Sequence, residues 1–260
     1  MYTDTHCHLP LVDGDEPVET VLARAREAGV TAFVTVGVDL ASSAEAVQVA
    51  AGFDQVWAAV GIHPHNAIEA TDHVLGRLKV VASHPQVVAI GETGLDYFRD
   101  HSPRIRQEEA FREQIRLAKE LDKALVIHCR DAQDDVLAIL TDERAPERTV
   151  FHCFSGDEHL VGQCARHGWF MSFAGNVTFK NAPGLRAAAA AAPVELLVAE
   201  TDAPYLSPHP YRGKPNEPAR VRFVVEALAE LHDIPVEEMA EHTSANARRL
   251  FRLPASANGT

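Results

Sequence analysis

The sequence predicts one α/β domain, a single-domain (β/α)8 TIM barrel, from three observations. Short apolar runs of the kind found in buried parallel strands alternate with helical segments along the chain. The length of 260 residues fits a barrel, which usually takes about 250 residues. Histidines and carboxylates follow most of the runs, and a closed barrel brings many strand ends together. A doubly wound open sheet is the rival fold, but it places ligands at one switch point only.

Eight runs, mostly rich in Val, Ile, Phe or Ala, are the expected strands. They are Tyr2–His6, Thr31–Val36, Val56–Gly61, Val87–Gly91, Ala124–His128, Thr149–Cys153, Trp169–Phe173 and Leu196–Glu200. Helical segments lie between and after them. These are Pro17–Ala28, Leu40–Ala51, Asp72–Ser83, Arg104–Asp122, Ala132–Leu140, Glu158–His167, Pro183–Ala192, Pro218–His232 and Pro235–Phe251. The order β, α, β, α predicts a parallel sheet covered by helices.

Local signals support several of the helices. Pro17 suits a first helical position, and Gly29 suits the end of the same helix. The third helix stops before Pro85, as expected for residues that precede a proline. A stripe of apolar residues in Arg104–Asp122 is expected to pack against the sheet; it consists of Phe111, Ile115, Ala118 and Leu121.

No repeat or shift in composition divides the chain, so we expect one TIM-barrel domain over residues 1–253. Residues 254–260 are expected to form a frayed tail. The proline-rich segment Thr201–Pro218 is expected to be a structured loop over the mouth of the barrel.

The composition limits the classes of partner. The chain has 24 Lys and Arg against 37 Asp and Glu, a net charge of −13, so it lacks a global basic surface for nucleic acid. A phosphate-bearing substrate must be held by local cations. No signal peptide or membrane-spanning run is evident. We expect a cytoplasmic protein without a membrane partner, plausibly a monomer.

Four cysteines are interpreted as buried thiols, because nothing in their spacing suggests a disulfide framework. Three of them directly follow a histidine at a strand end, where alternation points them toward the outer helices. They are Cys7, Cys129 and Cys153, and the fourth is Cys164.

The most informative stretch is Thr3-Asp4-Thr5-His6-Cys7-His8. Alternate side chains of a strand share a face, so His6 and His8 point the same way and can hold one metal ion. A polar pair at a frayed terminus is the other interpretation. Further ligand-type residues at later strand ends favour metal; they are His63, His65, Glu92, His128, His152 and Asp202.

The expected geometry suggests two divalent ions. His6, His8 and Asp202 come from strands that are neighbours in a closed barrel. His128 and His152 come from strands five and six, and Glu92 on strand four could bridge the ions. Two such ions could clamp the attacking and leaving oxygens of a hydrolytic displacement and activate a water molecule.

The chain resembles the TatD family of metal-dependent hydrolases, described as magnesium-dependent deoxyribonucleases related to amidohydrolases. The matching segments cover almost the whole length. They are Asp4–His8, Gly61–His65, Gly91–Asp96, His128–Arg130, His152–Gly156, Glu200–Tyr205 and Arg212–Pro218. The resemblance implies metal ligands at His6, His8, Glu92, His128, His152 and Asp202. It also implies that Asp202 accepts a proton from the nucleophilic water.

Other residues are candidates for substrate contact. The resemblance places His63 near the metal ions and the substrate phosphate, so we assign Asp202, Glu92 and His63 to catalysis. His65 is a weaker candidate. Arg130, Arg212 and Lys214 could bind phosphate, although a solvated loop would also explain the last two. Asp4 and Asp96 could support the site or cap turns, and Phe154 and Tyr205 could stack a base or pack in the core.

The identity of the ions and the substrate stay open at this point. Magnesium prefers oxygen ligands, whereas four imidazoles favour zinc, manganese or similar ions; a third ion recruited with substrate is also open. The first functional hypothesis is a 3'-5' exonuclease on single-stranded DNA ends. The second is an ester or amide hydrolase using the same site, such as an aminoacyl-tRNA deacylase. The third is a non-enzymatic protein with a structural ion.

Overall fold

The computed structural model describes residues 1–12 and 16–254, so all but Pro254 of the predicted tail lies outside the described residues. Eight parallel strands form one sheet in the order β1 to β8, and each strand pairs with the next along the chain. The strands are β1 (Tyr2–Cys7), β2 (Val30–Val36), β3 (Val56–Val60), β4 (Val87–Asp96), β5 (Ala124–Arg130), β6 (Thr149–Phe151), β7 (Phe170–Phe173) and β8 (Leu197–Ala199). The predicted barrel is confirmed.

The sheet closes between β8 and β1 through single contacts rather than a full ladder. Cys7 and Ala203 form an isolated parallel bridge, and the backbone N–H of His8 donates to the Ala203 carbonyl at 2.8 Å. The Thr5 hydroxyl donates to the Ala199 carbonyl at 2.9 Å. The strand that ends in the first histidine motif therefore lies beside the segment that ends in Asp202.

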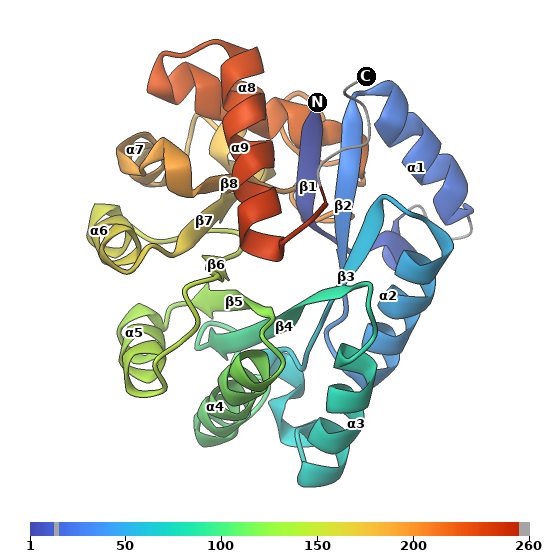
Figure 1. The fold of residues 1–260 in the computed structure, drawn as a ribbon. Helices are drawn as coiled ribbons and strands as arrows, with labels where there is room; N and C mark the ends of the chain where they lie inside the picture. The colour runs from blue at the N-terminus through green and yellow to red at the C-terminus, as the bar shows by residue number, and fades with distance from the viewer. Residues whose placement is uncertain (13–15, 255–260) are drawn as a thin grey trace.

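Helices surround the sheet on its outside (Figure 1). They are α1 (Val18–Glu27), α2 (Leu40–Gly52), α3 (Asp72–Ala82), α4 (Arg104–Glu120), α5 (Gln133–Asp142), α6 (Glu158–His167), α7 (Pro183–Ala191), α8 (Val221–His232) and α9 (Val236–Phe251). Short 3-10 turns are η1 (Leu9–Leu11), η2 (Pro64–Glu69), η3 (Gly175–Thr178), η4 (Val194–Leu196) and η5 (Pro218–Arg220).

Local sequence explains where several helices begin and end. The side chains of Asp39 and Asp157 accept backbone N–H groups in the first turns of α2 and α6, which is the usual role of aspartate at an N-cap. Gly168 ends α6 in the left-handed conformation with φ at +70°. The apolar stripe of α4 is buried as predicted, except that Leu121 is only partly buried.

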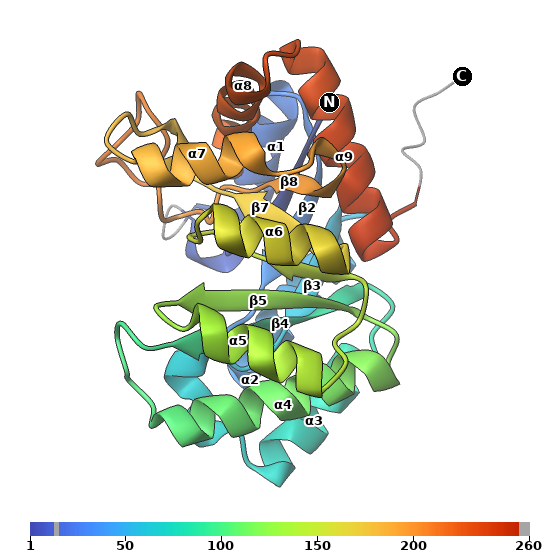
Figure 2. The same cartoon turned by 90° about the vertical axis from the view of Figure 1, so that its left-hand side faces the viewer.

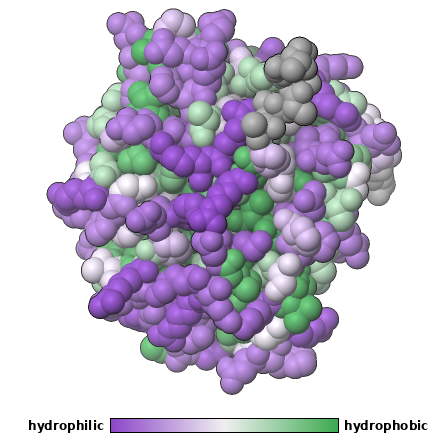
Figure 3. Space-filling view, in the orientation of Figure 1, coloured by the Kyte–Doolittle hydropathy of each residue, from purple (hydrophilic) through white to green (hydrophobic). Residues whose placement is uncertain are grey.

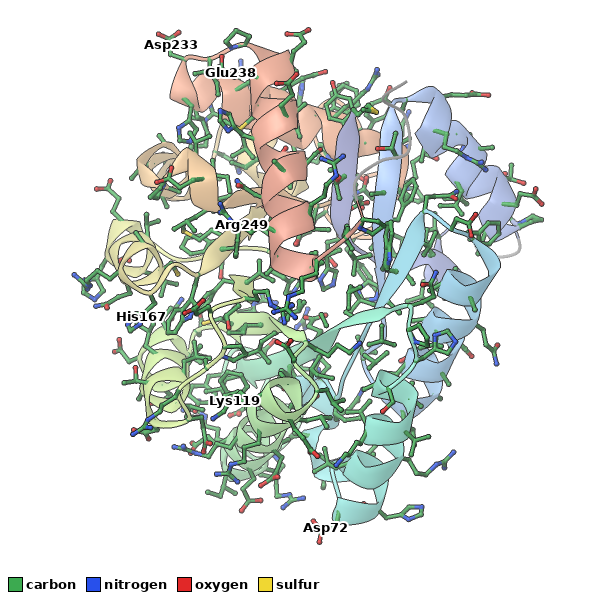
Figure 4. All side chains as sticks on the ribbon, viewed as in Figure 1. Asp72, Lys119, His167, Asp233, Glu238 and Arg249 are labelled. Atoms are coloured by element: carbon green, nitrogen blue, oxygen red, sulfur yellow. The ribbon has the colours of Figure 1, made fainter. Side chains whose placement is uncertain are left out.

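The two ends of the barrel differ in what they carry. Figure 2 shows β5 pointing toward the side on which the loops after β4 and β8 project. Figures 1 and 3 view the opposite side, at the amino ends of the strands, where much of the surface is hydrophilic. Most of the side chains labelled in Figure 4, such as Asp72 and Glu238, lie on the outer helices, and Asp233 lies in the turn between α8 and α9. Within the described residues, no helix has the length and hydropathy that a membrane crossing needs.

Candidate metal centre

All six predicted ligands meet at the carboxyl end of the barrel. Glu92 lies at their centre and is only 4% exposed. Its Oε1 lies 2.8 Å from Nδ1 of His128 and 2.8 Å from Nε2 of His152. Its Oε2 lies 3.5 Å from Nε2 of His6. The two oxygens of one carboxylate therefore face histidines from different parts of the barrel, as bridging requires.

A break in the strand ladder places Glu92 in this position. The β4–β5 register shifts between Ile90 and Thr93, and pairing then resumes to Asp96. Gly91, inside the break, has φ at +141°, and a Cβ there would lie 2.4 Å from the Val126 carbonyl oxygen. Only glycine fits such a close approach. Strand β4 continues to Asp96, beyond Gly91, where the sequence pattern placed its end, because its pairing with β5 resumes at Thr93 after the shift.

The closing seam of the barrel positions Asp202. Its carboxylate Oδ1 lies 3.5 Å from Nε2 of His8 and 3.8 Å from Nε2 of His6. Its backbone N–H donates to the His6 carbonyl at 2.9 Å, and its φ is +54°. Asp4 supports this turn, because its carboxyl group accepts from the N–H of Thr201 at 2.9 Å and from the Thr201 hydroxyl at 2.6 Å.

The donor set fits divalent cations. Three groups have ligand atoms within 4.8 Å of one another: His6 with His152 and Asp202, His6 with His8 and Glu92, and His63 with Glu92 and His128. His6 is fully buried, yet neither of its ring nitrogens has a hydrogen-bond partner among the residues that the structure describes. A buried polar atom without a partner is costly. A divalent cation bound by the His6 ring and the neighbouring imidazole and carboxylate groups would give His6 a partner and remove that cost.

Electrostatics keeps the carboxylates ionised. Burial alone would raise the pKa of Glu92, but the charge of His152 and hydrogen bonds with His128 and His152 outweigh it, so the pKa lies well below its usual value. Burial likewise opposes ionisation of Asp202, and contacts with His8 and His6 lower its pKa. Both residues are therefore anionic near neutral pH and suited to cations.

Two carboxylates outside the predicted ligand set contact the predicted histidine ligands. Glu200 is fully buried, and its Oε1 accepts from the Cys153 N–H at 2.8 Å and lies 3.1 Å from Nδ1 of His152. Asp96 Oδ2 lies 3.0 Å from Nε2 of His128. Such partners fix the orientation of a ligating imidazole. Sequence reasoning did not single out Glu200, and the Glu200-Thr201-Asp202 motif was the available signal.

Two glutamines of α4 reach inward to the strand ends and were also missed. Gln114 accepts from the Ile62 N–H at 2.7 Å and donates to the Thr93 hydroxyl at 2.7 Å. Gln107 accepts from the Asp96 N–H at 2.8 Å. Their seven-residue spacing, two helical turns, places them on one face and is the signal that could have identified them.

Comparison with known proteins agrees with this geometry. The family model described as "TatD related DNase" matches residues 3–252. The chain belongs to the TatD family. It is 43% identical over 254 residues to the "Uncharacterized metal-dependent hydrolase YabD" of Bacillus subtilis, covering 97% of this chain and all of that protein. The fold and family therefore identify a metal-dependent hydrolase.

Two further TatD relatives are informative. The chain is 37% identical over 249 residues to the "3'-5' ssDNA/RNA exonuclease TatD" of Cronobacter turicensis, covering 93% of this chain and 94% of that one. The crystal structure of YjjV, a TatD homologue of Escherichia coli, superposes with a TM-score of 0.92 and is 31% identical, covering 97% and 98% of the two chains. The family resemblance is thus confirmed across the whole barrel.

The predicted substrate-binding residues of this TatD-family protein lie at different distances from the ligand cluster. His63 is buried beside the cluster, with Nε2 3.3 Å from Glu92 Oε1. His65 is partly exposed and lies 2.9 Å from Asp96. Arg130 is exposed, and its guanidinium lies over the Phe98 ring. Arg212 and Lys214 lie on the exposed loop after β8, and no contact joins either to the ligand cluster in the part of the chain that the structure describes.

The remaining candidates separate into core and surface. Phe154 is buried and packs on Phe173, with ring centroids 5.4 Å apart, so apolar packing explains it. Tyr205 is 54% exposed beside His8. The cysteine thiols are free; Cys7 and Cys164 are buried as expected, whereas Cys129 and Cys153 are partly exposed. However, β6 ends before Cys153, whose φ is +43°, so strand alternation does not govern the direction of that thiol.

Proposed function

We propose that this TatD-family hydrolase cleaves phosphodiester bonds of single-stranded DNA from the 3' end. The observation that supports this most directly is Glu92, whose two carboxylate oxygens face opposite histidine groups within one buried cluster. A related chain is named a 3'-5' ssDNA/RNA exonuclease, and phosphodiester hydrolysis is a common use of paired divalent ions.

Six residues would hold two divalent ions in this proposal. His6, His8 and Asp202 would serve one ion, His128 and His152 the other, and Glu92 both. Bound divalent ions polarise phosphoryl oxygens and make water more acidic. Zinc, manganese and magnesium are the candidates, since imidazole favours the first two and the carboxylates accept all three.

Asp202 and His63 would supply the proton chemistry and the phosphate contact. The ionised carboxylate of Asp202 can accept a proton from the attacking water. Burial lowers the pKa of His63 to about 4, so its ring is neutral near pH 7. Nδ1 of His63 accepts from the His65 N–H at 3.0 Å, which places the ring proton on Nε2. Nε2 lies 3.3 Å from Oε1 of Glu92, and its N–H would donate to a phosphate oxygen bound beside that carboxylate.

Residues around the mouth of the barrel would guide the DNA strand. The guanidinium of Arg130 suits phosphate oxygens, and His65 would keep Asp96 in place through its 2.9 Å contact. Arg212 and Lys214 would contact the strand farther from the scissile bond. We expect Arg212 and Lys214 to contribute less to activity than the metal ligands, because both lie on an exposed loop.

Alanine variants of two ligands test the proposal. In metal-supplemented assays on labelled single strands, His128→Ala or Asp202→Ala should lose at least about 100-fold to 1,000-fold in turnover, the scale of losing a group that stabilises transition-state charge. Circular dichroism should show an unchanged fold. His73→Ala and Glu238→Ala, exposed changes on α3 and α9, are the matched controls and should retain full activity.

Substrate comparison completes the test. Strands labelled at the 3' or 5' end, duplex DNA, RNA and an aminoacyl ester should be assayed with each ion. Preferred release of 3' nucleotides from single strands supports the proposal. Full activity in the ligand variants, or faster hydrolysis of the ester than of any nucleic acid, would contradict it.

A further inference from the structure

We propose that the exposed ring of Phe98, backed by the guanidinium of Arg130, is a stacking platform for a nucleobase beside the scissile phosphate. This proposal rests on the proposed function and adds the recognition of the base. Phe98 lies in the loop after β4 and is 56% exposed, although it is a large apolar side chain. The ring lies near the predicted metal cluster, where an exposed aromatic side chain could contact a substrate.

Asp96 ties the platform to the metal centre. One oxygen of its carboxylate, Oδ2, lies 3.0 Å from Nε2 of His128. The other oxygen, Oδ1, accepts from the backbone N–H of Phe98 at 3.0 Å and of Arg99 at 2.8 Å. One carboxylate therefore fixes a predicted ligand and the loop that carries the ring, so the platform is held rigidly relative to the cluster.

Strand β5 brings Arg130 to the same place. His128 and Arg130 are two residues apart on the strand, so their side chains share a face. The pairing of β5 with β4 sets Arg130 opposite Asp96. Two residues of strand advance roughly 6.6 Å, which places Arg130 one step farther toward the mouth than His128.

The Arg130 guanidinium is available to a ligand. It lies over the Phe98 ring, 3.9 Å from the centroid. Its side chain makes no hydrogen bond or ion pair with any residue in the described ranges 1–12 and 16–254. Stacking occupies the flat face of a guanidinium and leaves its in-plane N–H donors free for phosphate oxygens. In a chain of net charge −13, a cation left without a carboxylate at the mouth suits an anionic ligand.

The pairing of an aromatic ring with arginine identifies the class of ligand. Single-stranded nucleic acids bind through base stacking on aromatic rings together with cations that contact phosphate. Arg130 lies against the ring at 3.9 Å, the guanidinium of Arg99 lies 5.7 Å from the same centroid, and the part of the ring that stays exposed can accept a base. We therefore assign to Phe98 the base adjacent to the cleaved linkage and to Arg130 the phosphate of the same nucleotide.

Oligonucleotides with one abasic nucleotide test this assignment. In the wild type, removal of the base next to the cleaved linkage should raise KM about 10-fold, the scale of one stacked base. Phe98→Leu should raise KM about as much with the intact strand and should show no further loss with the abasic one. Phe98→Trp should restore the difference. Arg130→Lys, which keeps the charge and loses the planar fork, should weaken binding of both strands equally.

Two controls separate this platform from general effects. Arg77→Ala and Val80→Ala, exposed on α3, should behave as wild type. Binding of a phosphorothioate strand, followed by fluorescence anisotropy, should give the same ranking of variants without turnover. Equal sensitivity to the abasic site in wild type and Phe98→Leu would overturn the platform while leaving nuclease activity intact. A wild type that neither binds nor cleaves single strands would overturn both proposals.

Discussion

The two ends of the barrel differ in whether their charged side chains are exposed or buried. At the amino end, Arg148 and Arg252 both pair with the exposed Asp122. At the carboxyl end, histidines and carboxylates are buried together, and within residues 1–12 and 16–254 both ring nitrogens of His6 lack a hydrogen-bond partner. Exposed pairs contribute little to stability, whereas unpartnered buried groups oppose folding. The carboxyl end is therefore arranged for a ligand, whereas the charged pairs of the amino end face solvent.

Metal binding should affect stability through the carboxyl end alone. An ion present at 100 times its Kd adds about 2.7 kcal/mol to the free energy of unfolding when it binds the native state only. Chelator-treated protein should be folded, and its thermal midpoint should rise when manganese or zinc is added. The rise should disappear in His6→Ala and persist in Arg252→Ala. Unfolding by the chelator alone would instead indicate a structural ion.

Glu200→Gln should weaken the site without removing a ligand. The variant keeps an oxygen near the His152 ring and loses the negative charge that orients it. Loss of such a partner costs about 10-fold to 100-fold in metal affinity or activity. Metal titration by calorimetry measures this effect, and circular dichroism checks the fold. Unchanged affinity would mean that Glu200 only fills the barrel interior.

The pH dependence of stability should reveal the buried carboxyl of Asp4. Burial raises its pKa to about 8, despite hydrogen bonds from Thr201 that favour ionisation. Between the unfolded value near 3.8 and pH 8, the folded state holds a proton that the unfolded state lacks. Stability contributed by this group is therefore present at low pH and falls by about 1.4 kcal/mol per pH unit within that window.

Comparison with Asp4→Asn isolates this effect. The asparagine has no proton to lose, so metal-free Asp4→Asn should gain stability relative to wild type as the pH rises from 5 to 8. Urea unfolding at several pH values measures the difference. A difference that does not change with pH would show that Asp4 is ionised in the folded protein.

Arg252→Ala should have the smallest effect. Its partner Asp122 lies on the surface at the amino end, where water screens the pair. We expect unchanged nuclease activity and a thermal midpoint within experimental error of wild type. A clear loss of activity would show that the two ends are coupled and that their separation into distinct roles is wrong.

Much of this arrangement was predictable because parallel strands leave a strong pattern. Short apolar runs predict β1 to β8, and the residues that follow them predict the cluster. The path of β4 was harder, since it depends on a register shift around Gly91 that the pattern of apolar residues does not carry. The same limit applies to Cys153, whose backbone turns away from the strand.

The supporting shell was less predictable than the ligands. Glu200 and Gln114 act through the directions of single side chains, which depend on the packed barrel rather than on local sequence. Phe98 is a large apolar residue of the kind that usually lies in a core, yet it lies at the surface. Only tertiary structure shows that Asp96 joins its loop to His128.

Anomalous diffraction from crystals grown with zinc or manganese tests the central claim most directly. If one carboxylate serves two cations, the maps should show two peaks, each about 2.0–2.2 Å from an oxygen of Glu92 in the case of zinc. One peak should lie beside His6 and the other beside His128. A single ion away from Glu92, or no ion among these residues at saturating metal, would contradict it.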